Sequence, residues 1–322
     1  MSSINAIIIL VLSLIGTKLS LIALIKYKIL DNPNDRSNHK IPVPRGGGIA
    51  MIAVSLFFLF HYKIDIFVII AAILLAIISF IDDMHGVSVK WRLFAQIIGV
   101  SLVLWFWQTG LFPQYIPIWA EKIFIALGWL WFINLTNFMD GIDGITAMQT
   151  ISMCLGISLL VDYNPNFPSE IAVYARVIEI ATIGFFFFNC SPAKVFAGDV
   201  GSITLGFLSG YLLIRLAYAG GIIPALILPA YYLCDATSTL LKRLLRGDKV
   251  WQAHSEHAYQ QAVRNGMSHN TVVARIALLN MLLIVLAGLT NFNILISLTA
   301  LICAYAVTTI FIIKLRKPVV KK

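Results

Sequence analysis

The chain has 322 residues, of which 59% are hydrophobic and only 12% are charged, and its mean hydropathy is +0.88. Because a soluble domain has about 25% charged residues, this composition excludes a soluble globular protein and predicts one integral membrane domain over residues 1–322. The net charge of +9 does not indicate nucleic-acid binding, since basic loops also set the orientation of membrane proteins.

Long apolar runs predict the membrane spans. At about 20 apolar residues for each span, we expect an all-α polytopic protein with eleven transmembrane helices. The predicted spans are residues 4–25, 46–62, 65–81, 92–109, 117–135, 143–161, 171–188, 200–217, 219–237, 273–290 and 293–313. The first run has no basic leading segment and no clear cleavage site, so we expect it to be retained as a span.

Lysine and arginine predict the orientation. With the N-terminus outside, 19 of the 24 Lys and Arg residues fall in the inward segments, as cytoplasmic loops require. Ten of the 15 acidic residues lie on the same side. We therefore expect a periplasmic N-terminus, a cytoplasmic C-terminus and a chemically active cytoplasmic face. The predicted cytoplasmic loops lie near residues 26–45, 82–92, 136–146, 189–200 and 238–275.

The central stretch 134–144 holds two amides and two carboxylates between apolar runs. Asn134, Asn137, Asp140 and Asp143 follow one another in steps of three residues. On a helix this spacing places all four side chains on one face, where they could share a metal, a phosphate or a nucleotide as ligand. The alternative is an Asn/Asp/Gly turn between two spans.

Two shorter stretches carry further acids. Asp82 and Asp83 are adjacent at the end of a span, where carboxylates are costly to bury unless they are paired or metal-bound. They suit a divalent cation, or a general base whose pKa is raised by its neighbour; a helix cap facing water is the alternative. Asp199 stands between Gly198 and Gly201 at a helix start, which resembles a small phosphate–Mg²⁺ element or a simple N-cap.

The loop over residues 31–48 is basic and rich in glycine. Lys40 and Arg45 precede three consecutive glycines at a helix entrance. Exposed backbone N–H groups there could bind an anion; equally, the loop could be a basic segment attracted to anionic lipid.

The last inward loop combines arginines with two histidines. Arg246 is followed by His254 and His257 in the sequence His-Ser-Glu-His. The histidines could bind phosphate or a metal, or form a solvated face. There is no HExxH motif and no third histidine at ligand spacing, so a zinc site is not expected. Acids, glycines and basic loops on one membrane face together suggest Mg²⁺-assisted phosphoryl chemistry.

Three of these motifs, in this order, resemble those of a known family. Asp82-Asp83, the NxxNxxDGxDG stretch at 134–144 and the GDxGS stretch at 198–202 are similar to those of the polyprenyl-phosphate N-acetylhexosamine-1-phosphate transferases. This glycosyltransferase 4 family includes the phospho-MurNAc-pentapeptide translocase and the GlcNAc-1-phosphate transferases. The resemblance extends from Lys40 to His257.

The resemblance implies an activity and its partners. Members transfer a sugar-1-phosphate from a UDP-activated N-acetylated amino sugar to undecaprenyl phosphate and release UMP. For this chain it implies Mg²⁺ as cofactor, with Mn²⁺ as a substitute, and a multi-pass location in the bacterial inner membrane with the active site facing the cytoplasm. Membrane lipid is a further partner, and we also consider a homodimer.

The resemblance also implies roles for individual residues. By position, Asp199 matches the metal ligand, and Asp82 and Asp83 match acids assigned to lipid-phosphate deprotonation or to the metal–diphosphate site. The expected catalytic residues are Lys40, Asp82, Asp83, Asp140 and Asp143, and the expected substrate-binding residues are Asn134, Asn137, Gly198, Arg246, His254 and His257.

Departures from the family pattern indicate the branch. The peptidoglycan branch has a run of consecutive histidines where this chain has only His254 and His257. The stretch 235–260 looks most like transferases that start O-antigen or capsule synthesis, in lipopolysaccharide or related cell-envelope biogenesis. The alternatives are phospho-MurNAc-pentapeptide transfer in peptidoglycan synthesis and, in another class, a proton-coupled transporter. Transporters place acids near mid-span, whereas here they lie at inner helix ends.

Overall fold

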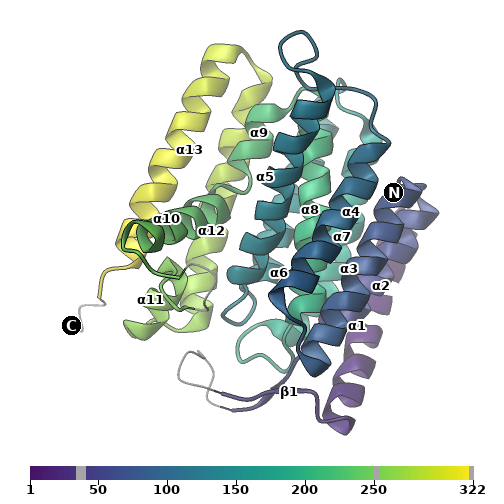
Figure 1. Cartoon of the computed structure of the whole chain (residues 1–322), viewed down its shortest axis with the longest axis vertical. Helices are drawn as coiled ribbons and strands as arrows, with labels where there is room; N and C mark the ends of the chain where they lie inside the picture. Colours follow the sequence, from purple (N-terminus) through teal and green to yellow (C-terminus); the bar gives the residue numbers. More distant parts are fainter. Residues whose placement is uncertain (34–40, 250–253, 319–322) are drawn as a thin grey trace.

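The computed structural model describes residues 1–33, 41–249 and 254–318. Within them the chain is almost entirely helical, with one short antiparallel pair of strands in which Leu30 faces Pro44. The elements are α1 (Ser3–Lys26), β1 (Leu30–Asp31), β2 (Val43–Pro44), α2 (Gly48–His61), α3 (Ile66–His85), α4 (Val89–Trp105), α5 (Ile118–Phe138), α6 (Ile145–Tyr163), α7 (Ser169–Asn189), α8 (Gly198–Tyr218), α9 (Ile222–Ile227), α10 (Ala230–Leu245), α11 (Ala258–Arg264), α12 (His269–Gly288), the 3-10 turn η1 (Leu289–Asn291) and α13 (Ile294–Leu315). Figure 1 shows them as a bundle.

In the described residues, eight helices are long and apolar enough to cross a membrane. They are α1, α3, α5, α6, α7, α8, α12 with η1, and α13. The helix α2 is apolar but has only 14 residues, and α4 has 17. These ten helices correspond to ten of the eleven predicted spans. The predicted all-α polytopic fold is therefore confirmed.

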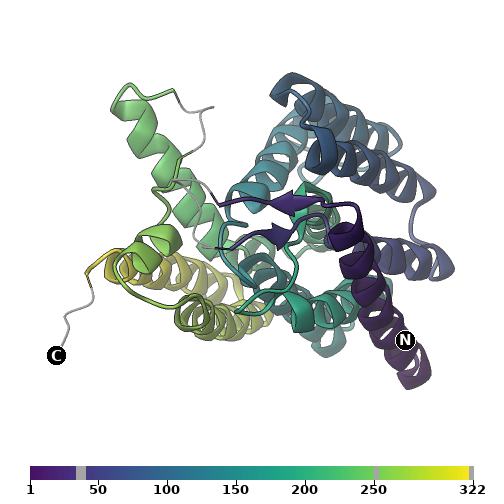
Figure 2. The same cartoon turned by 90° about the horizontal axis from the view of Figure 1, so that it is seen from below.

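The eleventh predicted span, 219–237, is wrong as a single helix. The chain forms α9, turns at Leu228 and Pro229, and continues as α10 to Leu245. Proline has no N–H to donate to the helical ladder, so the ladder of hydrogen bonds is interrupted at Pro229. In both views α10 runs across the direction of the long helices (Figures 1 and 2), and it includes residues expected to lie in a cytoplasmic loop.

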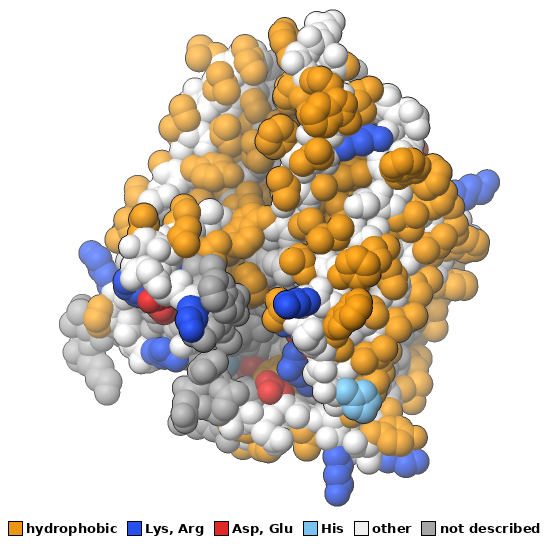
Figure 3. Space-filling model, in the orientation of Figure 1, with side chains coloured by type: hydrophobic (Ala, Val, Ile, Leu, Met, Phe, Trp, Pro, Cys, Tyr) orange, Lys and Arg blue, Asp and Glu red, His pale blue; other side chains and the backbone are white. Residues whose placement is uncertain are grey.

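The segments predicted to face inward gather at one end of the bundle. The α3–α4, α5–α6 and α7–α8 connections, the strands β1 and β2, α11 and the end of α13 all lie at the lower end in Figure 1, which Figure 2 shows from below. Figure 3 shows hydrophobic side chains over the flanks and charged side chains gathered toward the lower end. The bundle thus has one chemically distinct end.

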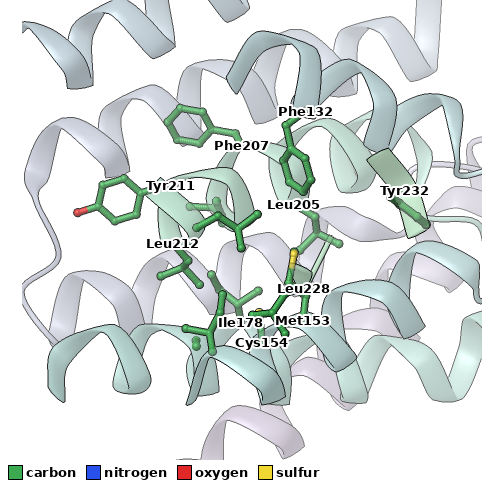
Figure 4. Close-up of a cluster of buried hydrophobic side chains, with 14 of the residues drawn as sticks. Phe132, Met153, Cys154, Ile178, Leu205, Phe207, Tyr211, Leu212, Leu228 and Tyr232 are labelled. Carbon is green, nitrogen blue, oxygen red and sulfur yellow. The ribbon is translucent and has the colours of Figure 1, made fainter. Parts of the chain in front are cut away.

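The helix α8 is the core of the bundle, and nearly all of its residues are buried. It packs against α3 and α5, and the rings of Phe207 and Trp129 stack with centroids 4.8 Å apart. Figure 4 shows Leu205, Phe207, Tyr211 and Leu212 of α8 among buried side chains from other helices. Because lipid is as apolar as leucine, close packing of this kind associates helices in membranes.

Glycines allow α2 and α8 to touch. A Cβ on Gly48 would lie 2.5 Å from Gly201 Cα and 2.8 Å from Ala197 O. We expect Gly48→Ala to lower the stability by about 1–3 kcal/mol, because the backbone of α8 must shift to admit the methyl group. Thermal unfolding in detergent measures this.

The matched control is Gly128→Ala in α5, where an added Cβ meets no atom within 4 Å. This change should be neutral or slightly stabilising, since alanine favours helices more than glycine does. Equal melting temperatures for the two variants would contradict the proposed contact between α2 and α8.

Candidate active site

Asp199 lies in the first turn of α8 and forms ion pairs with two arginines. Its Oδ1 is 2.6 Å from Arg45 Nη2, and its Oδ2 is 2.8 Å from Arg92 Nη1. Arg45 directly follows β2, and Arg92 lies in the first turn of α4. One carboxylate therefore connects the β2–α2 loop, α4 and α8 at the lower end of the bundle.

Asp83, at the end of α3, caps the N-terminus of α8. Its Oδ1 accepts the N–H of Asp199 at 2.9 Å, and its Oδ2 accepts the N–H of Val200 at 3.0 Å. Arg45 Nε lies 2.7 Å from Asp83 Oδ1, and the Asp83 side chain has no exposed surface. The first N–H groups of a helix lack partners within the helix and attract negative charge. Asp83 is thus a residue that positions Asp199.

Asp82 shares an arginine with Asp199. Its Oδ2 lies 2.9 Å from Arg92 Nη1, and its Oδ1 accepts the N–H of Val87. The same Arg92 Nη1 lies 2.8 Å from Asp199 Oδ2, so this guanidinium bridges the two carboxylates. The paired acids and the acid of the GDxGS stretch, 116 residues apart, therefore form one cluster with Arg45 and Arg92.

Gly198 belongs to the support of this cluster. It has a φ of +71°, and a Cβ there would meet Asp83 Oδ2 and lie 2.7 Å from Gly46 N. Only glycine combines a left-handed backbone with so close an approach. Gly198 was predicted to bind substrate; the structure places it against Asp83 and Gly46.

The central stretch does not form one helical face, so that part of the prediction is wrong. Asn134 and Asn137 lie on α5, but α5 ends at Phe138, and Asp140 and Asp143 follow in the connection to α6. The turn that the glycines permit replaces the helix here. The alternative of a turn between two spans holds for the second half of the stretch.

The two amides face different neighbours. Asn134 Nδ2 donates to Gln96 Oε1 of α4 at 2.7 Å, and Asn137 Oδ1 accepts from Ser202 Oγ of α8 at 2.8 Å. Asn137 is therefore tied to the first turns of α8, close in sequence to Asp199. Both amides join α5 to a helix that carries a member of the cluster.

Asp143 is tied to a different part of the structure. Its Oδ2 lies 3.2 Å from His269 Nδ1 and accepts the N–H of Ala193 at 3.2 Å. Burial opposes ionisation, but hydrogen bonds from His269, Ser191 and Ala193 prevail and lower the pKa of Asp143. The side chain thus joins the α5–α6 connection to the α7–α8 loop and α12. The structure does not bring it to Asp199.

Asp140 lies nearer to the cluster. Asp140 is half-buried, and the partial loss of water around its carboxyl, together with the negative charges of Asp199 and Asp83, raises its pKa to about 7 against opposing effects of Thr146 and Arg45. The charge of Asp140 acts also on Tyr259 of α11, whose hydroxyl donates to Phe138 O at 3.1 Å. The charge of Asp140 therefore acts on both the cluster and α11.

The predicted basic loop is largely neutralised by its own acids. Arg246 pairs with Asp248 and lies 2.8 Å from Glu256. Burial and the charges of neighbouring cationic groups lower the pKa of His254 and of His257 to about 4. At neutral pH both histidines are uncharged, so in this arrangement they can hydrogen-bond to a phosphate but not neutralise it. Lys40 lies outside the described residues.

Mg²⁺ prefers oxygen ligands such as these carboxylates. However, both oxygens of Asp199 are already paired with guanidinium groups. The described residues also contain no group of three or more His, Cys, Asp or Glu side chains arranged to hold a metal. A metal ion at Asp199 therefore stays a prediction, which the carboxylate oxygens of the cluster allow as possible ligands.

Arg45 and Arg92 are the members of the cluster that the expected site lacked. Both were visible as cations near the motifs, but only the fold shows that they meet at Asp199. The sequence signal that could have indicated these arginines is the number of acids at the ends of apolar helices, because buried carboxylates need cations or hydrogen-bond donors close by.

Residues 66–217 match the model of Glycosyl transferase family 4. A probable undecaprenyl-phosphate N-acetylglucosaminyl 1-phosphate transferase of Bacillus subtilis is 25% identical, over 79% of this chain and 75% of that protein. A phospho-N-acetylmuramoyl-pentapeptide-transferase of Orientia tsutsugamushi is 29% identical, over 80% of this chain and 85% of that protein.

The predicted family is confirmed. The region that matches the family model runs from the start of α3 nearly to the end of α8. It contains Asp82, Asp83, Arg92 and Asp199, whereas Arg45 and α10 to α13 lie outside it. Four of the five cluster residues therefore come from the part of the chain that the family model describes.

We expect Asp83→Ala to lower the stability by about 3–5 kcal/mol, because it leaves Arg45 and two N–H groups of α8 without their buried partner. Asp162→Ala is the matched control, because Asp162 pairs with Arg176 with 43% of its side chain exposed, and such surface pairs contribute about 0–1 kcal/mol. Chemical or thermal unfolding in detergent compares the two. A smaller loss for Asp83→Ala than for Asp162→Ala would contradict the capping role.

The raised pKa of Asp140 predicts a pH-dependent stability. Between its ordinary value of 3.8 and about 7, the folded state holds a proton that the unfolded state releases, so ionisation destabilises the fold increasingly as the pH rises through this range. We expect Asp140→Asn, which stays neutral, to melt higher than the wild type at pH 8 and at the same temperature at pH 4. A melting difference that is constant over this range would contradict the prediction.

Proposed function

We propose that the chain transfers an N-acetylhexosamine-1-phosphate from a UDP-sugar to undecaprenyl phosphate. The products are UMP and a lipid-linked sugar diphosphate. The observation that supports this is the meeting of Asp82, Asp83 and Asp199 with Arg45 and Arg92 at one end of an apolar bundle. The names of the Bacillus subtilis and Orientia tsutsugamushi relatives describe reactions of this class.

The location suits a reaction between a lipid and a water-soluble nucleotide. A polyprenyl phosphate keeps its hydrocarbon in the membrane and its phosphate at the surface, where the helix ends lie. An oxygen of that phosphate attacks the phosphorus next to the sugar. A new P–O bond forms, and the P–O bond to the uridylate phosphate breaks, so that UMP leaves. Phosphoryl transfer of this kind depends mainly on positioning and charge neutralisation.

Asp82 is the acid that we propose keeps the lipid phosphate deprotonated. Both oxygens of Asp83 accept backbone N–H groups, so that residue is committed to holding α8. Among the described residues, Asp82 accepts one backbone N–H, that of Val87, and 8% of its side chain is exposed. A direct displacement then needs no phosphoryl-enzyme intermediate. We further propose that Asn134, Asn137 and Asp140 contact the nucleotide sugar, and that His254 and His257 lie near its phosphates.

We also propose that Mg²⁺, or Mn²⁺ in its place, binds at Asp199. A bound divalent ion neutralises charge on a diphosphate and on its leaving group. It would have to replace at least one of the guanidinium contacts of Asp199, which the exposed sides of Arg45 and Arg92 permit.

The proposed setting is the bacterial cytoplasmic membrane, with the active site facing the cytoplasm. The proposed product initiates O-antigen, capsule or a related cell-envelope polysaccharide. Phospho-MurNAc-pentapeptide transfer is the second candidate, because the Orientia tsutsugamushi relative carries that name. The separated His254 and His257 favour the first.

The test measures UMP released by the purified protein with undecaprenyl phosphate and a panel of donors: UDP-GlcNAc, UDP-FucNAc, UDP-QuiNAc and UDP-MurNAc-pentapeptide. We expect release with one donor class and only in the presence of acceptor. Asp199→Asn should reduce it about 100-fold or more, the usual effect of removing one transition-state charge contact, while Asp162→Asn should not.

No release with any donor, together with proton-driven solute uptake in proteoliposomes, would contradict the transferase and favour a transporter. A radiolabelled phosphosugar trapped on the protein without acceptor would contradict the direct displacement alone.

A further inference from the structure

The two arginines cover the acidic cluster. The side chains of Asp82, Asp83 and Asp199 are at most 8% exposed, whereas those of Arg45 and Arg92 are 35% and 26% exposed. The solvent therefore meets guanidinium groups first and carboxylates behind them. An anion that arrives at this end of the bundle contacts the arginines.

The contacts leave donors unused. A guanidinium has five N–H donors, and Arg92 reaches both Asp82 and Asp199 through Nη1 alone. In the described part of the chain, Nε and Nη2 of Arg92 donate to no carboxylate or carbonyl. Arg45 uses Nε and Nη2 for Asp83 and Asp199. Each guanidinium can thus stay paired with a carboxylate and donate its remaining N–H groups to a second oxyanion.

We propose that Arg45 and Arg92 form a clamp for the phosphate groups that meet at Asp199. The proposal rests on the proposed function and names two binding residues for it. The planar fork of arginine matches two phosphate oxygens, which a lysine ammonium cannot do. The acids of the cluster hold both forks in place before any phosphate arrives, which lowers the cost of ordering them on binding.

The surroundings of the two arginines differ. Arg92 borders a space between α3, α4 and α8 that is too narrow to hold a water molecule and is lined mainly by apolar side chains, with the polar Ser79 and Gln96 among them. Arg45 precedes the glycine turn that leads into α2. A mainly apolar surrounding suits a phosphate attached to hydrocarbon, and a glycine turn suits a nucleotide diphosphate. Either source carries the same oxyanion chemistry, so the experiment tests both.

The test measures the affinity of the purified full-length protein for two phosphate probes and their phosphate-free controls. The probes are UDP with uridine as its control, and farnesyl phosphate with farnesol. The variants are Arg45→Gln and Arg92→Gln. The matched control is Arg215→Gln, because Arg215 lies on α8 too but pairs with Glu170 at the opposite end. Arg45→Lys and Arg92→Lys keep the charge and serve if a glutamine variant does not fold.

We expect each clamp variant to bind at least one phosphate probe about tenfold to a hundredfold more weakly, since charged hydrogen bonds of this kind contribute that much. Binding of uridine and farnesol should be unchanged, as should all binding by Arg215→Gln. The probe that responds identifies the source of the phosphate that each arginine binds.

Wild-type affinity of both clamp variants for UDP and farnesyl phosphate would overturn the clamp. So would an equal loss for a probe and its phosphate-free control, which indicates a structural role only. If the wild type transfers sugar phosphate in these cases, the proposed function stands and the clamp alone fails. A wild type that binds neither phosphate probe and releases no UMP overturns both.

Discussion

The hydrogen bonds between Asp83 and the first N–H groups of α8 are the contact on which the arrangement of the lower end depends. They join the end of α3 to the start of the most buried helix, and they place Asp199 where two arginines from other segments reach it. A helix start needs acceptors for its free N–H groups, and here the acceptor comes from another helix rather than from the preceding residue. The carboxylate of Asp83 therefore both joins α3 to α8 and fixes the position of Asp199 in the candidate site.

Burying three carboxylates at apolar helix ends has a large desolvation cost. Arg45 and Arg92 offset this cost, because their guanidinium groups pair with all three carboxylates. This gives the acids a defined geometry, but a ligand must then compete with contacts that already exist. The unused donors of Arg92 and the exposure of both guanidiniums reduce that conflict, because a phosphate can add to the cluster without separating it. Asp143, by contrast, is not part of the cluster. Its carboxylate contacts His269 and Ala193 and joins the segments that carry them, away from Asp199.

The sequence predicted the helices well, because an apolar run of about 20 residues in a membrane can satisfy its backbone hydrogen bonds in few ways other than a helix. It failed at residues 219–237, where Pro229 breaks the run into α9 and α10, since mean hydropathy does not register a break of two residues. At the central stretch, regular three-residue spacing suggested one helical face, but α5 ends before Asp140. Spacing predicts a common face only while the backbone stays helical, and the glycines of this stretch permit it to turn.

By itself the sequence determined the all-α membrane class, the gathering of polar segments at one end and the motifs by which the family is recognised. These depend on local composition and order, which the chain carries directly. Only the tertiary structure decided that Arg45 and Arg92 meet at Asp199, that Asp83 caps α8, and that Asp143 serves a different contact. Those pairings join residues up to 154 positions apart, and they depend on how helices pack in three dimensions, which no local pattern specifies.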